Sequence, residues 1–143
     1  MKVVELLLSN GANVNDKATN GRSSLYAASQ NGHVEVVELL LSNGANVNDK
    51  TTNGRISLHA ASYEGHEEVV ELLLSKGADI HEKCINGKTA LMTASAKGHK
   101  IVVKLLTFWP HCVGIIVFRE LGRENALLYS LLDYHFMSIL AYI

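Results

Sequence analysis

The stretch VEVVELLLSNGANVND, residues 34–49, decides how this chain folds. It recurs as KVVELLLSNGANVND at 2–16 and as EEVVELLLSKGADIHE at 67–82, so the same segment returns every 33 residues. Residues 17–49 and 50–82 are identical at 22 of 33 positions, and a looser copy follows as NGKTALMTASAKGHKIVVKLL. A fixed period of this length is typical of repeat proteins, and it predicts a chain built from repeated structural units.

Each unit has the pattern of two short helices joined by turns. The NG pair at 20–21 predicts a tight turn, because both residues tolerate positive φ. SSLYAASQN at 23–31 predicts a first helix, which Gly32 ends. The second helix, 33–42, has an apolar stripe and a polar stripe, and Gly44 suits the left-handed position after it. An extended stretch then leads to the next turn.

These motifs resemble the ankyrin repeat, which has a period of 33 and the signature T-P-L-H-x-A before its second helix. The matching stretches are SSLYAA (23–28), ISLHAA (56–61) and TALMTA (89–94). The resemblance covers residues 1–107. It implies an all-α fold, an α-solenoid of stacked helix-turn-helix repeats with β-hairpin-like loops.

The chain also departs from that signature, and the departures predict lower stability with the same fold. The signature proline is absent from every copy, and the signature histidine survives only as His59. The acidic residue that usually precedes the hairpin turn is replaced by Ala18, Thr51 and Cys84. Each loss removes local hydrogen bonds or rigidity.

The register predicts where each unit begins and ends. We expect a partial repeat at 1–16, full repeats at 17–49 and 50–82, a further repeat at 83–107, and a hydrophobic, non-repeat helical tail at 108–143. The chain starts within a second helix, so we expect preceding sequence to be missing. A half repeat acting as a cap, or two chains pairing at that end, are the alternatives.

The period fails at LLTFWPHCVG, where Pro110 takes the place of the glycine that ends the other second helices. Proline cannot adopt the left-handed conformation, so the chain must leave this helix differently. We expect an amphipathic or buried helix over 122–141 rather than a membrane span. A cap, a decayed fifth repeat and out-of-frame translation after Leu106 all remain open. Phe108 and Trp109 are expected to cover the last repeat.

Composition and charge limit the classes of partner. The net charge of −1 provides no overall basicity for nucleic acid binding. Cys84 and Cys112 lack metal-site spacing, and we expect reduced thiols in a cytoplasmic protein, with a nuclear location also compatible. His33, His66 and His99 are one repeat apart, about 10 Å, which is too far for a shared zinc ion. We therefore expect them to cap and pack the second helices.

No catalytic arrangement is recognisable in the sequence. His111 and Cys112 could be combined with Asp133 or His135 as a nucleophile and base, but adjacent side chains on an extended segment diverge. An orienting third group and an oxyanion motif are both lacking, and there is no phosphate-binding glycine motif. We expect neither enzymatic activity nor a cofactor.

Charge is unevenly distributed over the last two units. The third unit has an acidic second helix, with Glu67, Glu68 and Glu71. The fourth unit is basic, with Lys83, Lys88, Lys97, Lys100 and Lys104. The preferred interpretation is a solvated surface with weak ion pairs between repeats. The alternative is a basic patch for an acidic peptide or an anionic surface.

The resemblance implies that another protein binds to the hairpin tips and first helices, which line a concave groove. The corresponding tip positions are Thr19, Asn20, Arg22, Thr52, Asn53, Arg55, Ile85, Asn86 and Lys88. The first-helix positions are Gln30, Asn31, Tyr63, Glu64, Ala96 and Lys97. We expect Arg22, Arg55, Tyr63 and Lys88 to anchor the partner, since Tyr and Arg are enriched among binding hot spots.

The predicted function is therefore non-enzymatic protein binding without a cofactor. The main alternative is a truncated or degenerate structural fragment of a larger ankyrin-repeat protein, with no binding activity of its own. Self-association through uncapped ends is compatible with both interpretations. A membrane-tethered adaptor is a third interpretation, although membrane association is not expected.

Overall fold

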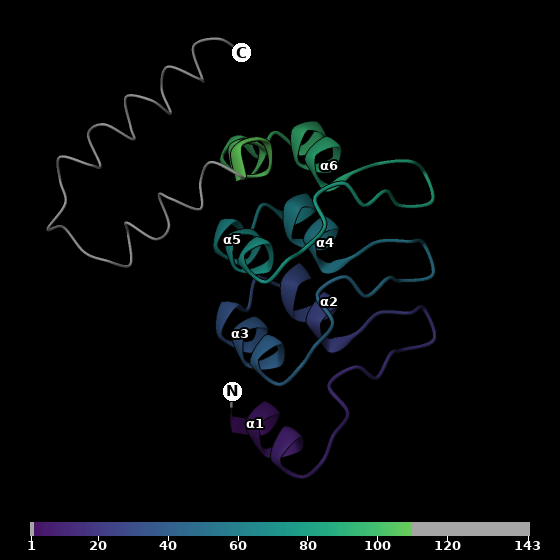
Figure 1. The fold of residues 1–143 in the computed structure, drawn as a ribbon, viewed down its shortest axis with the longest axis vertical. Coiled ribbons are helices and arrows are strands. Elements are labelled where there is room, and N and C mark those ends of the chain that lie inside the picture. Colours follow the sequence, from purple (N-terminus) through teal and green to yellow (C-terminus); the bar gives the residue numbers. More distant parts are fainter. Residues whose placement is uncertain (1, 110–143) are drawn as a thin grey trace, which may run out of the picture. The chain divides into compact units, whose positions relative to one another are not determined.

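Short helices alternate with loops throughout residues 2–109, the part of the chain that the computed structural model describes (Figure 1). The helices are α1 (Lys2–Ser9), α2 (Ser24–Gln30), α3 (Val34–Ser42), α4 (Ser57–Glu64), α5 (Glu67–Ser75) and α6 (Ala90–Lys97). Residues 100–109 form one more helical run. Within the described residues there is no strand, only an isolated antiparallel bridge between Lys17 and Ser23. The predicted all-α repeat fold is confirmed.

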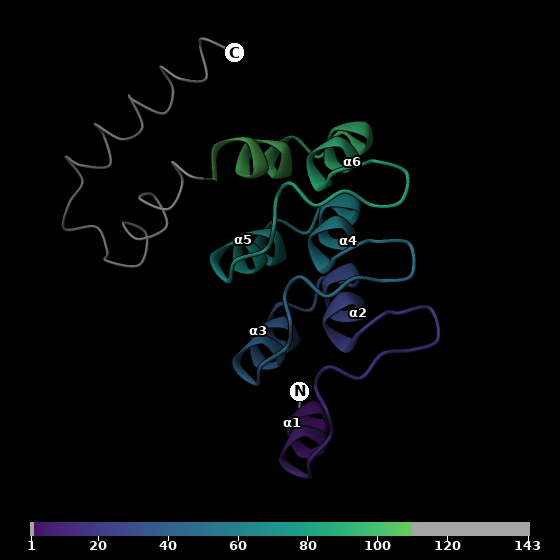
Figure 2. The same ribbon diagram turned by 45° about the vertical axis from the view of Figure 1, so that its right-hand side comes forward.

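The helices of residues 1–107 form two parallel columns. The first helices α2, α4 and α6 stack in one column, and the second helices α1, α3 and α5 stack in the other (Figures 1 and 2). α4 packs against both α2 and α6, and also against α5 of its own repeat. The hairpin loops all project from the side of the first helices (Figure 1). One repeat therefore positions the next, and the tips follow one another along a single edge.

The first helices begin at a side-chain cap, and the cap differs between repeats. The Ser23 Oγ accepts the Tyr26 N–H at 3.2 Å, and the Thr89 Oγ1 accepts the Met92 N–H at 3.3 Å. The middle repeat has Ile56 at this position, which has no side-chain acceptor. There the Nδ1 of His59 accepts the N–H of Ile56 at 3.1 Å. The one histidine that matches the family signature thus bonds a different N–H at the start of α4, that of Ile56 itself, while its own N–H donates to the Ile56 carbonyl at 3.0 Å.

The core lies between the two columns of helices. Its fully buried side chains include Leu25, Val37, Ile56, Leu58, Val69, Val70, Leu73 and Val102. Small residues of the first helices, such as Ala61 and Ala94, are also completely buried. Ser29 and Ser62 are also buried, and their hydroxyls have no hydrogen-bond partner among the described residues. The apolar stripe predicted from the period is the face that packs inward.

The packing role predicted for the periodic histidines is confirmed at His66 and His99, whose rings lie against Gly32 and Gly65 of the preceding repeat. The predicted capping role is wrong for His33 and His66, since neither makes a side-chain cap hydrogen bond to its helix. Instead the Nε2 of His66 lies 2.9 Å from the carbonyl oxygen of Gln30, in the preceding repeat. The Nε2 of His99 lies 2.8 Å from the carbonyl oxygen of Tyr63 in the same way. The last carbonyl groups of a helix have no hydrogen-bond partner within that helix. Each of these histidine rings therefore binds a carbonyl at the C-terminal end of the first helix in the preceding repeat.

The chain divides into two compact units, Met1–Thr107 and Phe108–Ile143. Phe108 is buried and Trp109 is partly buried. The predictions for His111, Cys112, the 122–141 helix, a fifth repeat and the other tail alternatives lie outside the described residues. The limits of individual repeats remain predictions. Among the described helices, none has the length and apolar character that crossing a membrane requires.

Candidate functional site

Each hairpin tip is a tight turn closed by the same backbone hydrogen bond. The first tip residue donates its N–H to the carbonyl of the fifth, at 2.9 Å for Ala18 to Arg22, 2.9 Å for Thr51 to Arg55 and 3.0 Å for Cys84 to Lys88. The fourth residue is a glycine with positive φ in every tip, as the NG turns predicted. We call the segments 18–22, 51–55 and 84–88 together the tip row.

Hydrogen bonds between neighbouring hairpins make the tip row continuous. The Thr52 N–H donates to the Asn20 carbonyl at 3.1 Å, and the Ile85 N–H donates to the Asn53 carbonyl at 2.9 Å. The tips also approach closely, because a Cβ added at Gly21 would lie 2.8 Å from the Thr52 nitrogen. Backbone hydrogen bonds therefore hold the tips at a fixed spacing. The tip side chains are attached to a backbone that is itself held in place.

All nine predicted tip residues are exposed, and Ile85 has 76% of its surface accessible. On the first helices, Asn31, Glu64, Ala96 and Lys97 are exposed, and Tyr63 is 40% exposed. Gln30 is only partly buried, and its carbonyl already accepts from the ring of His66. The structure thus brings the tip residues into one row, with the first-helix residues on successive helices of the neighbouring column.

Two aromatic rings support cations at this surface. The Lys97 ammonium lies 4.3 Å from the centroid of the Tyr63 ring, one repeat away. Contact with Tyr63 raises the pKa of Lys97 above its usual value. The Arg22 guanidinium lies 5.3 Å from the centroid of the buried Tyr26 ring. Sequence reasoning did not predict this contact between Arg22 and Tyr26. The signal was an arginine four residues before an aromatic residue in the first turn of a predicted helix.

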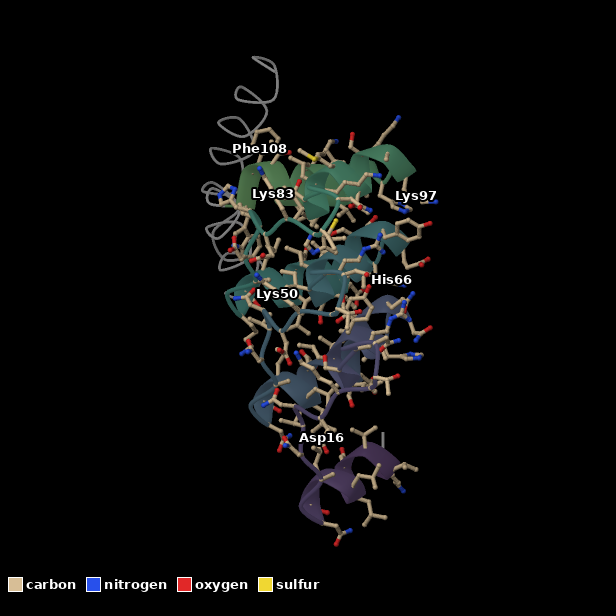
Figure 3. All side chains as sticks on the ribbon, turned by 90° about the vertical axis from the view of Figure 1, so that its right-hand side faces the viewer. Asp16, Lys50, His66, Lys83, Lys97 and Phe108 are labelled. Carbon is tan, nitrogen blue, oxygen red and sulfur yellow. The ribbon has the colours of Figure 1, made fainter. Side chains whose placement is uncertain are left out.

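Ion pairs that join the first and last residues of a 33-residue unit form a second row beside the tips. Lys17 Nζ lies 2.6 Å from an Asp49 carboxylate oxygen, and Lys50 Nζ lies 2.7 Å from a Glu82 carboxylate oxygen. We call this the lysine ladder; Figure 3 labels Asp16, Lys50 and Lys83, which lie in succession along the stack. The ion pairs expected from the sequence were placed between repeats and on other residues, whereas these two pairs lie within the units 17–49 and 50–82. The signal was the boundary between units itself, where an acid is followed by a lysine at 16–17, 49–50 and 82–83.

Two titratable groups lie beneath the tips. Burial lowers the pKa of His59, although backbone hydrogen bonds with Lys88 and Glu82 partly oppose this effect. Burial raises the pKa of the Cys84 thiol, but backbone hydrogen bonds from Asn86 and Lys88 and the nearby Arg55 guanidinium outweigh burial, so the pKa is lowered overall. Cys84 is a free cysteine. No group of His, Cys, Asp and Glu within residues 2–109 is arranged to hold a metal ion.

Comparison with known families identifies the repeats. A family model described as "Ankyrin repeats (3 copies)" matches residues 1–84 and again residues 52–114. No curated protein matches the chain. The two matched segments overlap and together include every described helix, as the resemblance predicted. The chain therefore belongs to the ankyrin-repeat family, whose members generally serve in protein–protein interaction and are generally not enzymes.

Proposed function

We propose that this chain is a protein-binding module whose partner lies along the tip row and the exposed ends of the first helices. The observation that carries the proposal is the continuity of this surface. Backbone hydrogen bonds join the Asn20, Thr52 and Ile85 tips, and the side chains they present are exposed. A rigid surface loses little conformational freedom when a partner binds, which favours recognition.

The differences between the two most similar repeats support the same surface. Repeats 17–49 and 50–82 differ at Gln30 and Tyr63 and at Asn31 and Glu64, all at the ends of first helices. Most buried positions, such as Leu25 and Leu58, are the same in both repeats, although the buried pairs Ser23/Ile56 and Tyr26/His59 differ. Varied residues at the exposed ends of the first helices give each repeat its own contacts while the stack is preserved. Tyr63 and Arg55 are the expected anchors, because both types are enriched among hot spots.

The test is selection of ligands from a displayed peptide library on the full chain, followed by affinity measurements on variants. The double variant Arg55→Glu with Tyr63→Ala should weaken the selected ligands at least about thirtyfold, since hot-spot losses are about 2 kcal/mol or more. The matched control is Glu35→Ala with Glu38→Ala, two exposed positions on the outer stripe of α3. It should change affinity less than about twofold.

The alternative, a structural fragment of a larger ankyrin-repeat protein without independent binding, makes the opposite prediction. Selection would then return no ligand whose affinity depends on Arg55 or Tyr63. Circular dichroism of each variant should match the parent chain, because both anchors are exposed and neither supports the core. A ligand that binds the anchor variant and the parent equally would place recognition elsewhere and overturn the proposal.

A further inference from the structure

The tip row carries one cation per repeat and no anion. The three tips read ATNGR, TTNGR and CINGK, and their last residues are Arg22, Arg55 and Lys88. All three are exposed, and none forms an ion pair within the described part of the chain. The cations occupy the same place in successive repeats, and the hairpin loops that carry them follow one another along one edge of the stack (Figure 1).

The acids nearest to the second and third tips are already paired. Asp49 and Glu82 precede these tips by two residues, and both are paired with lysines of the lysine ladder, Lys17 and Lys50. Each lysine of the lysine ladder thus forms an ion pair with a carboxylate that could otherwise pair with a tip cation. Asp16 stands at the same place before the first tip. Figure 3, which looks onto the hairpin side, shows Lys50 and Lys83 on one edge and His66 and Lys97 on the opposite edge. The tip cations remain available to a partner.

The spacing of the cations sets the geometry of a complementary partner. Packed helices lie about 8–10 Å apart, so successive tip cations repeat at roughly that distance. A polyproline II segment advances about 3.1 Å per residue with three residues per turn, so every third side chain lies on one face about 9.3 Å further on. A β-strand fits less well, because residues three apart point to opposite faces.

An α-helix is the second conformation that could match the spacing. Seven residues of helix rise about 10.5 Å, and residues seven apart lie near one another on the helix surface. A helix, however, has already used its backbone groups in internal hydrogen bonds. The polyproline II backbone is free to bond, and the exposed amide side chains of Asn53 and Asn86 lie beside the cations. The tip row therefore favours the extended segment.

We propose that the tip row recognises an acidic segment of a partner protein in polyproline II conformation, with a carboxylate at every third residue facing Arg22, Arg55 and Lys88. This inference rests on the proposed function and specifies its partner. Recognition by exposed charges also makes binding sensitive to salt, because exposed pairs are screened over about 8 Å at physiological ionic strength.

The test uses fluorescently labelled synthetic peptides and anisotropy titrations with the full chain at low ionic strength. The spaced probe repeats glutamate-proline-proline three times. The clustered control has the same composition with its three glutamates adjacent, and a third probe places glutamates seven apart in an alanine-rich helix. The spaced probe should bind at least about fivefold tighter than either control. Equal affinity for the spaced and clustered probes, or preference for the helical probe, would overturn the inference.

Variants of the chain locate the bound probe. Arg55→Glu, at the centre of the series, should weaken the spaced probe about tenfold, because it replaces an attraction with a repulsion. Lys100→Glu makes the same change of charge at an exposed position outside the tip row, and it should change affinity less than about twofold. If the two variants changed the affinity for the spaced probe to a similar extent, binding would respond to net charge alone and the inference would be wrong.

Failure of this inference and failure of the proposed function are distinguishable. If library selection yields neutral or apolar ligands that Tyr63→Ala weakens, while the spaced probe does not bind, the protein-binding function stands and the acidic partner is wrong. If no selected ligand responds to Arg55 or Tyr63, both are wrong. If selected ligands contain acids at every third position, both are supported.

Discussion

α1, α3 and α5 share the segment VVELLLS, yet they are buried to very different degrees. α1 has no buried residue, α3 buries Val37 and Leu40, and α5 buries four residues, Val69, Val70, Leu73 and Leu74. The amino acids are the same, so their intrinsic preference for a helix and for an apolar environment is also the same. What differs is the set of neighbours.

The neighbours of each helix explain the series. α5 packs against α4 of its own repeat and against α3, whereas α1 has no first helix beside it within the described residues. Val3, Leu6 and Leu7 of α1 are each more than half exposed. In a repeat stack, stability comes from the intrinsic term of each unit and from the interfaces with adjacent units. The sequence VVELLLS determines which face of the helix can be buried. The neighbouring helices of the stack determine how much of that face is buried.

The largest expected effect comes from truncating the same leucine in each copy. Leu73 is 0% exposed, Leu40 is 3% exposed and Leu7 is 56% exposed. Leu73→Ala should lower the free energy of unfolding by about 3–4 kcal/mol and Leu40→Ala by about 3 kcal/mol, because each leaves a cavity. Leu7→Ala should cost less than about 0.5 kcal/mol. Urea titrations measure all three, and equal losses would mean that α1 is as well covered as α5.

A second pair of variants compares glycines with the same backbone geometry. Gly65 has φ +78° and Gly98 has φ +76°, but a Cβ at Gly65 would lie 2.5 Å from the His99 ring, whereas the space at Gly98 is open. Gly98→Ala should cost about 1 kcal/mol, from the left-handed backbone alone. Gly65→Ala should cost about 2–3 kcal/mol, because the ring must also move.

Thermal unfolding of both glycine variants checks this difference. Adding His99→Ala to Gly65→Ala should remove the extra cost, since the obstructing ring is then absent. If the two glycine variants unfold at the same temperature, the His99 ring is not held against the preceding repeat.

A smaller and opposite effect is expected from the buried serines. The Ser62 hydroxyl is buried without a partner among the described residues, whereas Ser95, at the matching position, is exposed. Ser62→Ala removes an unpaired buried polar group and should stabilise the chain by about 1 kcal/mol. Ser95→Ala should leave stability within about 0.5 kcal/mol. Destabilisation by Ser62→Ala in urea unfolding would show that the hydroxyl has a partner such as a buried water.

The smallest effect concerns pH. Burial lowers the pKa of His59 in the folded chain below its usual 6.5, so the unfolded chain binds more protons in the interval between the two values. The contribution of His59 is therefore complete above about pH 6.5 and is lost as the pH falls through the folded-state pKa. His59→Gln should flatten the decline of the unfolding free energy between about pH 7 and pH 5. An unchanged slope would show that other groups cause the decline.

Much of the fold followed from spacing alone. The 33-residue period located both columns of helices, and the NG pairs located turns whose glycines have positive φ. The exposure of the nine predicted tip residues also follows from the repeat, because each hairpin projects from the side of the first helices; Cys84, the first residue of its tip, is buried. These predictions depend on local geometry that each copy repeats.

The interactions between repeats were harder to predict from the sequence. The His66 ring and its acceptor, the Gln30 carbonyl, are 36 residues apart, so their contact depends on how one repeat is set against the next. Lys17 likewise reaches Asp49, at the other end of its own unit, rather than Asp16, its neighbour in the chain. The 33-residue period predicts neither the His66–Gln30 contact nor the Lys17–Asp49 contact. The unequal burial of α1, α3 and α5 was likewise invisible in their shared sequence.

The lysine ladder has a consequence for how such an array can change its copy number. Each 33-residue unit begins with the lysine and ends with the acid of the same ion pair, Lys17 with Asp49 in one unit and Lys50 with Glu82 in the next. A duplicated 33-residue unit inserted at this boundary would therefore bring both partners of its own pair. Lengthening by tandem duplication would thus require no compensating substitution along this edge, and recombination between near-identical copies would be structurally silent there.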